Sequence, residues 1–377
     1  MNEVKVLLVG IGGYGDNYIK EFLEKDIDAV TLVGICDPFA SQSPRYSEII
    51  ERKIPSFASV EEFFASNRAD LAVIASPIHT HLGYIQSCLE HKCNVLCEKP
   101  PFMALSEFQR LEALERESGC FVGIGYQQCY SRDVLALKKD ILSGRYGKPV
   151  ALKALRMMRR GSAYYSRNSW AGKIQCRGID VFDSPLSNAC AHEIQNMLFV
   201  LGKELGLTTS IATLQAKCYK ANPTIENFDA VALQAVTTEG VPLNYYTAHC
   251  IPSTKVGPFA CYEFEKGTIV LGSEGNGFVA SAKDGSLIRD YSLVNKGDRL
   301  QKLYDCISCV RERNRPVCTL VTSYEHISLV NRVQAVPVLG LDDSQVEVIK
   351  NESETFFVAK GLQELFCSCY EKAQLPQ

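Results

Sequence analysis

The sequence lacks both a long apolar run and a run of one charge sign. No apolar stretch approaches the ~18 to 20 residues that a membrane-spanning helix needs, and no signal-type start precedes Val4. Lys and Arg total 40 against 43 Asp and Glu, a net charge of -3. The chain therefore has no excess of positive charge of the kind that binds nucleic acid or an anionic membrane surface. We therefore expect a cytoplasmic protein whose partners are small molecules, with no nucleic acid and no membrane.

A complete set of metal ligands is also missing. Among 16 cysteines, Cys306 and Cys309 have C-x-x-C spacing, but no second pair and no nearby His completes a zinc or redox site. Disulfide frameworks belong to small secreted domains, so reduced thiols are expected. We predict no metal and place these two cysteines on the apolar face of a helix.

What is present is the alternation of a doubly wound α/β sheet, followed by a change of pattern. The predicted strands are 4–9, 30–36, 71–75, 94–97 and 121–126, and the predicted helices include 14–24, 185–201 and 300–310, with helices at 60 and 107 started by capping boxes at Ser59 and Ser106. After Ser131, alternating runs at 228–236 and 243–249 indicate an antiparallel sheet with one covered and one open face. The tail predicts a strand at 346–349 and a helix at 356–370. With 377 residues, two domains are expected, 1–126 and 127–377.

A glycine motif follows the first predicted strand. Gly10-Ile11-Gly12-Gly13-Tyr14-Gly15 has G-x-G-x-x-G spacing and opens a helix, and Asp37 ends the next strand 22 positions after Gly15. Gly10 permits the tight turn, Gly12 has no Cβ to block a pyrophosphate, and Gly15 allows helix and strand to approach. The other interpretation is a glycine turn that binds nothing. The context predicts an NAD-binding Rossmann domain over residues 1–126.

Asp37 also bears on the choice of cofactor. Its carboxylate is expected to accept hydrogen bonds from the adenosine ribose hydroxyls and to repel a 2′-phosphate, which favours NAD over NADP. Arg45 is the nearest downstream cation that could relax this preference.

Two further clusters follow predicted parallel strands. Ser76-Pro77-Ile78-His79-Thr80-His81 and Glu98-Lys99-Pro100 lie where open α/β sheets bind ligands. Together with Gly125-Tyr126-Gln127 they make the chain resemble the glucose-fructose oxidoreductase/inositol dehydrogenase family (Gfo/Idh/MocA). That family has Thr/Ser-Pro followed by His, then Glu-Lys-Pro, then a helix with Asp-x-x-x-His.

The resemblance covers most of the chain, including Trp170-Ala171-Gly172. It implies a Rossmann domain plus an α/β domain with a large, mostly antiparallel open-faced sheet that forms homodimers or homotetramers. It implies hydride transfer at a carbinol or carbonyl of a sugar, inositol or related polyol. Cofactor-binding residues are then expected at Gly10, Gly12, Gly13, Tyr14, Gly15, Asp37, Ser76, Pro77, His81, Glu98, Lys99, Gln127 and Trp170.

A dehydrogenase needs one group that polarises the reacting oxygen and another that takes its proton. Lys99 fits the first task, because a desolvated ammonium can stabilise alkoxide character in the transition state; the alternative is a solvated lysine paired with Glu98. His192 is the predicted proton acceptor, on a helix where Asn188, His192 and Gln195 share one polar stripe. The alternative is an ordinary wet helix surface, and the family position of His192 favours catalysis.

Asn188 stands where the family usually has Asp, which makes it a third candidate catalytic residue. The change leaves two other functions open: a glycoside hydrolase that uses NAD for transient oxidation, or a non-catalytic NAD or sugar sensor. Net NADH release from alcohols distinguishes the dehydrogenase from both.

Overall fold

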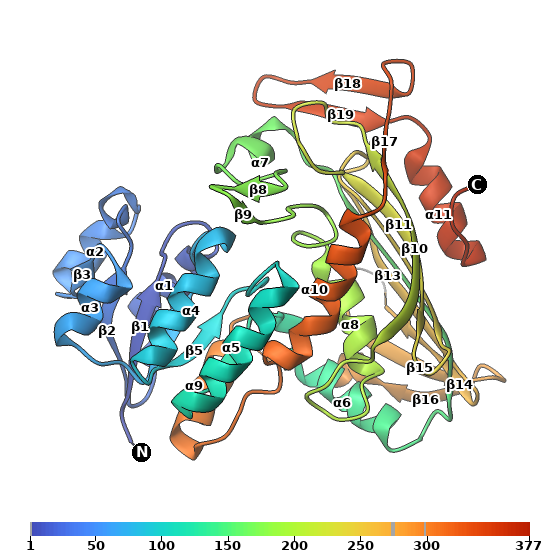
Figure 1. Ribbon diagram of the computed structural model, residues 1–377. Coiled ribbons are helices and arrows are strands. Elements are labelled where there is room, and N and C mark those ends of the chain that lie inside the picture. Colours follow the sequence, from blue (N-terminus) through green and yellow to red (C-terminus); the bar gives the residue numbers. More distant parts are fainter. Residues whose placement is uncertain (1, 273–275, 298) are drawn as a thin grey trace. The chain divides into compact units, whose positions relative to one another are not determined.

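The computed structural model describes residues 2–272, 276–297 and 299–377 (Figure 1). They form two compact units, one from residues up to 130 together with 299–323, and the other from 131–297 together with 324–377. The patterns in the sequence had placed the whole of 127–377 in the second domain. The chain instead returns to the first unit after residue 298 before it completes the second.

The first unit contains a six-stranded parallel sheet in the order β3-β2-β1-β4-β5-β6, the strand order of a dinucleotide-binding fold. Its strands are β1 Val4–Val9, β2 Val30–Cys36, β3 Ser56–Phe57, β4 Leu71–Ile74, β5 Asn94–Cys97 and β6 Val122–Ile124. Its helices are α1 Gly15–Glu24, α2 Tyr46–Glu51, α3 Val60–Ser66, α4 His81–Glu90, α5 Leu105–Ser118 and α9 Gln301–Glu312. Because all strands are parallel, their carboxyl ends lie at one edge of the sheet.

Helix α9 completes the core of this unit. Leu300, Leu303, Cys306 and Ile307 belong to the same buried cluster as the apolar residues of β1. Cys306 is therefore part of an apolar helix face, as the sequence predicts.

The chain after α9 adds to the same sheet. Thr319 forms an antiparallel bridge with Gly123 of β6, and the Tyr130 hydroxyl donates to the Cys318 carbonyl at 3.0 Å. Residues 299–323 thus supply both a covering helix and an edge contact to the first unit.

The second unit contains a nine-stranded sheet in the order β16-β15-β14-β13-β7-β12-β11-β10-β17, with parallel pairing only at β7/β12 and β10/β17 among the described strands. Its strands are β7 Pro149–Met158, β10 Ile211–Lys220, β11 Ala230–Thr237, β12 Pro242–Ala248, β13 Lys255–Phe264, β14 Gly267–Leu271, β15 Phe278–Ala282, β16 Leu287–Asp290 and β17 Val338–Gly340. Two small hairpins are β8 Gln175–Cys176 with β9 Ile179–Asp180, and β18 Val346–Lys350 with β19 Thr355–Ala359. Its helices are α6 Arg132–Leu142, α7 Ser162–Ser166, α8 Ala191–Val200 and α11 Leu362–Lys372, and α10 Leu320–Gln334 runs from the first unit into this one. The predicted fold class, a doubly wound parallel sheet plus a mostly antiparallel α/β domain, is confirmed.

The central strands of the large sheet are covered on both faces. Tyr245 and Tyr246 are neighbours on β12, so they point to opposite faces. The Tyr245 hydroxyl donates to the Cys190 carbonyl before α8 at 2.5 Å, whereas the Tyr246 hydroxyl donates to the Cys369 carbonyl of α11 at 3.0 Å. The face expected to be open is therefore occupied by α11 over β7, β11 and β12 (Figure 1).

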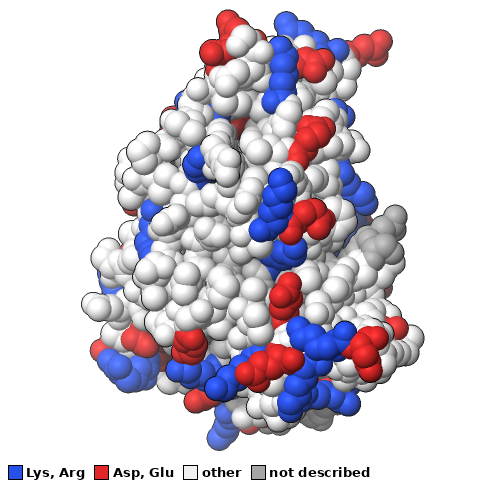
Figure 2. Space-filling model, turned by 90° about the vertical axis from the view of Figure 1, so that its right-hand side faces the viewer, with Lys and Arg blue, Asp and Glu red and all other residues white. Residues whose placement is uncertain are grey.

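Exposed apolar side chains on this sheet include Phe259, whose ring lies 6.1 Å from that of Tyr370 in α11. Others are Val270 and Leu287 toward one edge of the sheet and Val338 and Leu339 on β17 at the other. On the side of the molecule that carries α11, positive and negative side chains are interspersed and neither sign forms an extended patch (Figure 2). Within the described residues, no helix has the length and apolar character needed to cross a membrane.

Three predicted elements differ from the structure. Residues 356–370 are not one helix, because 355–359 form β19, paired with β18 across a turn in which the Asn351 side chain accepts from the amides of Ser353 and Glu354. The helix predicted at 185–201 begins only at Ala191, after a series of turns. The capping box at Ser106 is also wrong, since α5 begins at Leu105 and its N-cap, Ala104, forms no side-chain cap bond; the one at Ser59 is confirmed by its bond from the Glu62 amide.

Candidate active site

Two glycines of the turn between β1 and α1 are required by the fold. Gly10 has φ of 84°, and a Cβ there would lie 2.8 Å from the Ser76 Cα. A Cβ on Gly15 would lie 2.3 Å from the Gly10 carbonyl oxygen. Both distances are far below van der Waals contact, so these two positions accept only glycine.

Gly12 is a glycine that the fold does not need. A Cβ built there meets no protein atom within 4 Å, and its φ is not in the left-handed region. The space beside Gly12, at the start of α1, is where a dinucleotide pyrophosphate would approach the free N–H groups of the helix. The residues of the turn therefore fit the cofactor.

The Asp37 carboxylate is oriented by two backbone amides. The Ile11 amide donates to Oδ2 and the Phe39 amide to Oδ1, each at 2.9 Å. A carboxylate offers about four lone-pair sites, so both oxygens keep acceptor capacity for ribose hydroxyls. The first of these bonds also fixes the glycine turn against the end of β2.

Arg45 forms ion pairs with three carboxylates. Its guanidinium lies 2.9 Å from Asp16, 3.5 Å from Glu48 and 3.7 Å from Glu24. A guanidinium with this many carboxylate partners is a poor partner for a 2′-phosphate. The alternative in which Arg45 relaxes the preference for NAD is therefore disfavoured.

His81 joins the loops that follow β4 and β5. Its Nε2 lies 2.8 Å from the Ser76 carbonyl and its Nδ1 lies 2.7 Å from the Pro100 carbonyl. Burial lowers the pKa of His81, while the two carbonyls act in the opposite direction. The contact with His81 fixes the backbone at Pro100, and thereby the position of the half-buried Lys99 that precedes it.

A buried ion pair holds Glu98. The Lys302 ammonium from α9 contacts Glu98 Oε1, which also accepts from the Tyr18 hydroxyl at 2.7 Å. Lys302 is 1% exposed and donates to the Gly125 carbonyl at 3.2 Å. A Cβ on Gly125 would lie 2.8 Å from Glu98 Oε2, so this glycine makes room for the carboxylate.

The same lysine connects three residues predicted to bind cofactor. Lys302 lies 4.6 Å from the centre of the Tyr14 ring, and the Tyr14 hydroxyl donates to Gln127 Oε1 at 3.4 Å. Tyr14, Glu98 and Gln127 therefore belong to one network. Sequence reasoning missed Lys302, because nothing local marks a lysine on an amphipathic helix as buried.

In the second unit, Asn188 is oriented by a carboxylate that sequence reasoning missed. Its amide donates to Asp183 Oδ1 at 2.8 Å, and the Gly172 amide donates to Asp183 Oδ2 at 2.7 Å. Asp183 is 2% exposed. The Asp183-Ser184-Pro185 sequence, an acid directly before a turn, is the signal that could have found it.

His192 lies in the first turn of α8 and is half-buried. Gln195, which the sequence placed on the same polar stripe, is 1% exposed, and Asn188 precedes α8, so the three residues do not form one stripe on this helix. Trp170 follows a turn in which Asn168 Oδ1 accepts from the amides of Trp170 and Ala171 at 3.1 and 2.8 Å. Asn188, His192 and Trp170 are therefore all in the second unit, whereas the other predicted site residues are in the first.

His249, which no sequence motif singles out, belongs to an aromatic cluster. Its Nδ1 lies 3.0 Å from the Tyr165 hydroxyl, and the Tyr164 ring packs edge-on against it at 5.4 Å. Burial, followed by the charges of Arg160 and Arg167, lowers the pKa of His249 well below its usual value. His249 is therefore neutral at pH 7. His326 is a core residue whose Nε2 lies 3.1 Å from the Leu186 carbonyl.

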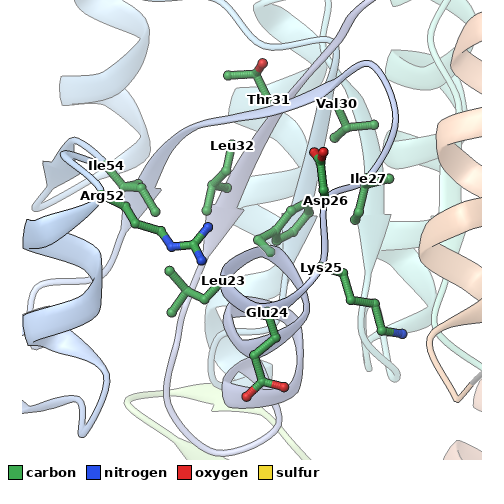
Figure 3. A pocket seen from close by; sticks show the side chains of 11 residues that line it. Leu23, Glu24, Lys25, Asp26, Ile27, Val30, Thr31, Leu32, Arg52 and Ile54 are labelled. Carbon is green, nitrogen blue, oxygen red and sulfur yellow. The ribbon is translucent and has the colours of Figure 1, made fainter.

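A pocket of about 590 Å³ in the first unit does not coincide with any of these residues (Figure 3). It is lined by the end of α1, from Phe22, and by the start of β2, at Val30, Thr31 and Leu32. The start of a strand lies at the edge of the sheet opposite to its carboxyl end. This pocket is therefore not the cofactor site.

The strand order, the glycine turn and the acid at the end of β2 define a dinucleotide-binding domain. Residues 4–126 match the model of the Gfo/Idh/MocA family, described as an oxidoreductase family with an NAD-binding Rossmann fold. This match to the NAD-binding domain of the family confirms the predicted resemblance.

Curated relatives match only part of the chain. An inositol 2-dehydrogenase from Rubrobacter xylanophilus is 30% identical over 152 residues, which cover 40% of this chain and 43% of the relative. Inositol 2-dehydrogenase 1 from Mycolicibacterium vanbaalenii is 26% identical over 155 residues, 40% of this chain and 44% of the relative. The match thus spans less than half the length of either protein.

Solved structures share the fold over most of the chain. The WlbA dehydrogenase from Bordetella pertussis, in complex with NADH and UDP-GlcNAcA, has a TM-score of 0.74 at 19% identity and covers 88% of this chain and 96% of its own. A levoglucosan dehydrogenase in complex with NADH has a TM-score of 0.73 at 13% identity, with 88% and 96% covered. At these identities the likeness shows the fold.

We predict that the Glu98–Lys302 pair stabilises the first unit. Lys302→Met should lower the free energy of unfolding by about 3–5 kcal/mol, because it leaves a buried carboxylate without its cation. Adding Glu98→Gln should restore a large part of that loss. Urea unfolding of the single and double variants measures both effects.

The matched control is Lys20→Met, which removes the lysine of an exposed pair with Glu24 at 3.8 Å and should cost no more than about 1 kcal/mol. Equal unfolding free energies for Lys302→Met and the double variant would contradict the coupling.

We predict that Asn188→Asp adds a pH-dependent loss to the free energy of unfolding. Two carboxylates would then meet where the Asn188 amide now donates to Asp183 at 2.8 Å, which raises the pKa of the new carboxyl above its unfolded value. A raised folded pKa stabilises the protein below the unfolded pKa and loses that contribution as pH rises. The variant should therefore approach wild-type stability near about pH 4. At pH 7 it should be less stable by about 1.4 kcal/mol for each pH unit that separates the folded from the unfolded pKa.

Urea unfolding at several pH values tests this prediction, with Asn188→Ala as the control that loses the hydrogen bond but adds no charge. A constant difference between Asn188→Asp and wild type across the range would rule out a close Asp183.

Proposed function

We propose that this protein is an NAD-dependent oxidoreductase that transfers a hydride between the nicotinamide and a carbinol or carbonyl of a sugar, inositol or related polyol. The observation that carries the proposal is the glycine turn. Gly10 and Gly15 are glycines because the fold requires it, whereas Gly12 faces open space at the start of α1, where a pyrophosphate would approach. Asp37 and the neutralised Arg45 support NAD in preference to NADP.

In this proposal the bound nicotinamide supplies the hydride acceptor and donor. Lys99 donates a hydrogen bond to the reacting oxygen and stabilises its negative character. His192 takes the proton from that oxygen during oxidation and returns it during reduction. Asn188, whose amide donates to Asp183, helps to position the turn that leads into α8 and His192.

The sugar or polyol substrate is supported by the kind of proteins that the chain matches. The curated relatives named above are inositol dehydrogenases, and a solved neighbour is a levoglucosan dehydrogenase. We further propose that homodimers or homotetramers form through the part of the large sheet that α11 leaves exposed, where Val270 and Leu287 lie.

Gly12→Val should abolish NADH binding without unfolding the protein. A Cβ there meets no protein atom within 4 Å, but the side-chain carbons of valine occupy the approach of the pyrophosphate. Calorimetry with NADH measures the loss. Gly83→Val, at an exposed helical glycine that is equally unobstructed, should bind NADH like the wild type; equal affinity in all three proteins would exclude the turn as the cofactor site.

Lys99→Met should lower kcat by about 10² to 10⁴ while NADH affinity stays within a few-fold, because its interaction forms at the reacting oxygen. The assay follows NADH absorbance with myo-inositol, aldoses and their derivatives as substrates. Lys5→Met, at an exposed position of β1, is the control and should keep full activity. If glycosides are cleaved without net NADH, or if NADH binds and no polyol reacts, the dehydrogenase proposal fails.

A further inference from the structure

Two arginines flank one tyrosine ring in the second unit. The Arg167 guanidinium carbon lies 3.5 Å from the centre of the Tyr164 ring, and that of Arg160 lies 4.7 Å from it. Within the described part of the chain, neither guanidinium forms an ion pair with a carboxylate. Two like charges beside one ring repel each other, so the arrangement favours a shared anionic partner.

One buried carboxylate near Tyr164 is held by other groups. Asp183 acts electrostatically on Tyr164, but its two oxygens accept from the Gly172 amide and the Asn188 side chain. It therefore orients the turn before α8.

The cluster also contains buried polar atoms without partners. Arg160 Nε and His249 Nε2 are both shielded from solvent, and neither forms a hydrogen bond in the structure. A buried donor left unpaired costs about 1–3 kcal/mol. Arg160 Nε is always a donor, and Nε2 of the neutral His249 is one when the Tyr165 hydroxyl donates to Nδ1.

A neighbouring arginine shows the contrast. Arg159 donates to the Pro252 carbonyl at 2.6 Å and stacks 4.5 Å from the Phe356 ring, so its side chain is satisfied by the protein. The side-chain hydrogen bond of Arg160 goes to the Met158 sulfur at 3.9 Å, which is a weak acceptor. Arg167, like Arg159, donates to a backbone carbonyl, that of Tyr164 at 2.5 Å. The contrast with Arg159 therefore points to a ligand for Arg160 in particular.

We infer that Arg160 and Arg167 bind an anionic group, a carboxylate or a phosphate, on the substrate. The substrate class then narrows from polyols in general to acidic sugars, with Tyr164 and His249 completing the anion site. This inference deepens the proposed oxidoreductase function and rests on it for the sugar portion of the ligand. The two guanidiniums supply the planar donor geometry that carboxylate and phosphate oxygens accept.

Calorimetry on the NADH-loaded protein tests the inference with D-glucuronate, D-glucose 6-phosphate and D-glucose. At least one of the two anions should bind about ten times more tightly than glucose, and which of them does so distinguishes carboxylate from phosphate. Arg160→Leu and the exposed Arg167→Leu should each remove that difference. Arg177→Leu, at an exposed arginine of the same unit, should leave it unchanged.

Equal binding of glucose and both anions, or full retention of the difference in Arg167→Leu, overturns the anion site. Arg167 is exposed, so its replacement does not threaten the fold as the replacement of Arg160 could. NADH formation from the same sugars is recorded in parallel. If the three sugars bind equally and NADH is formed, only the anion site is refuted. If an anion binds selectively and no NADH is formed, only the proposed oxidoreductase function is refuted.

Discussion

The ion pair between Glu98 and Lys302 is the interaction on which the organisation of the first unit depends. A charge as buried as Lys302 is tolerated only with a well-placed counter-charge and further hydrogen-bond acceptors, and Glu98 and the Gly125 carbonyl supply them. The pair fixes α9 to the end of β5, and the Tyr18 hydroxyl connects it to α1, the helix that follows the glycine turn. Burial and the Glu98 charge raise the pKa of Tyr18, so this hydroxyl stays a donor.

This pairing changes the interpretation of Glu98. The family resemblance assigns it to the nicotinamide ribose, and the structure shows that its Oε1 already accepts from two donors. Oε2 is the oxygen with room for a further contact. The lysine that pairs with this carboxylate lies 204 residues further along the chain, in a segment that the sequence patterns had given to the other domain.

What the sequence predicted well is local in origin. The strands at 4–9 and 30–36 match β1 and β2, because buried parallel strands are short apolar runs bounded by turns. The glycine turn and the Ser59 cap were also predictable, since each depends on a few adjacent residues. The strand predicted at 346–349 matches β18. Its partner β19 was expected to be helical, because the short apolar run Phe356-Phe357-Val358 fits a strand or a buried helix equally.

The residues of the candidate site that were missed depend on tertiary contacts. Asp183 acquires its role from bonds to Gly172 and Asn188, and His249 from packing against Tyr164 and Tyr165. Asp183 precedes a turn, but its hydrogen bonds cannot be read from that position alone. His249 has no motif, and its environment forms only when its strand is packed against the helix that carries the two tyrosines. The position of α11 on the sheet also depends on a tertiary contact, because its Cys369 carbonyl accepts from the Tyr246 hydroxyl of β12.

The interrupted first unit has a consequence for how the protein is made. A ribosome delivers β1 to β6 early, but Leu300, Leu303 and Ile307 of their core emerge only after most of the second unit has been synthesised. Until then the side of the nascent sheet that α1 covers lacks its second helix, α9, and apolar surface left exposed in this way is prone to aggregate. Newly made chains should therefore need a chaperone for longer than the 130-residue length of the leading segment suggests.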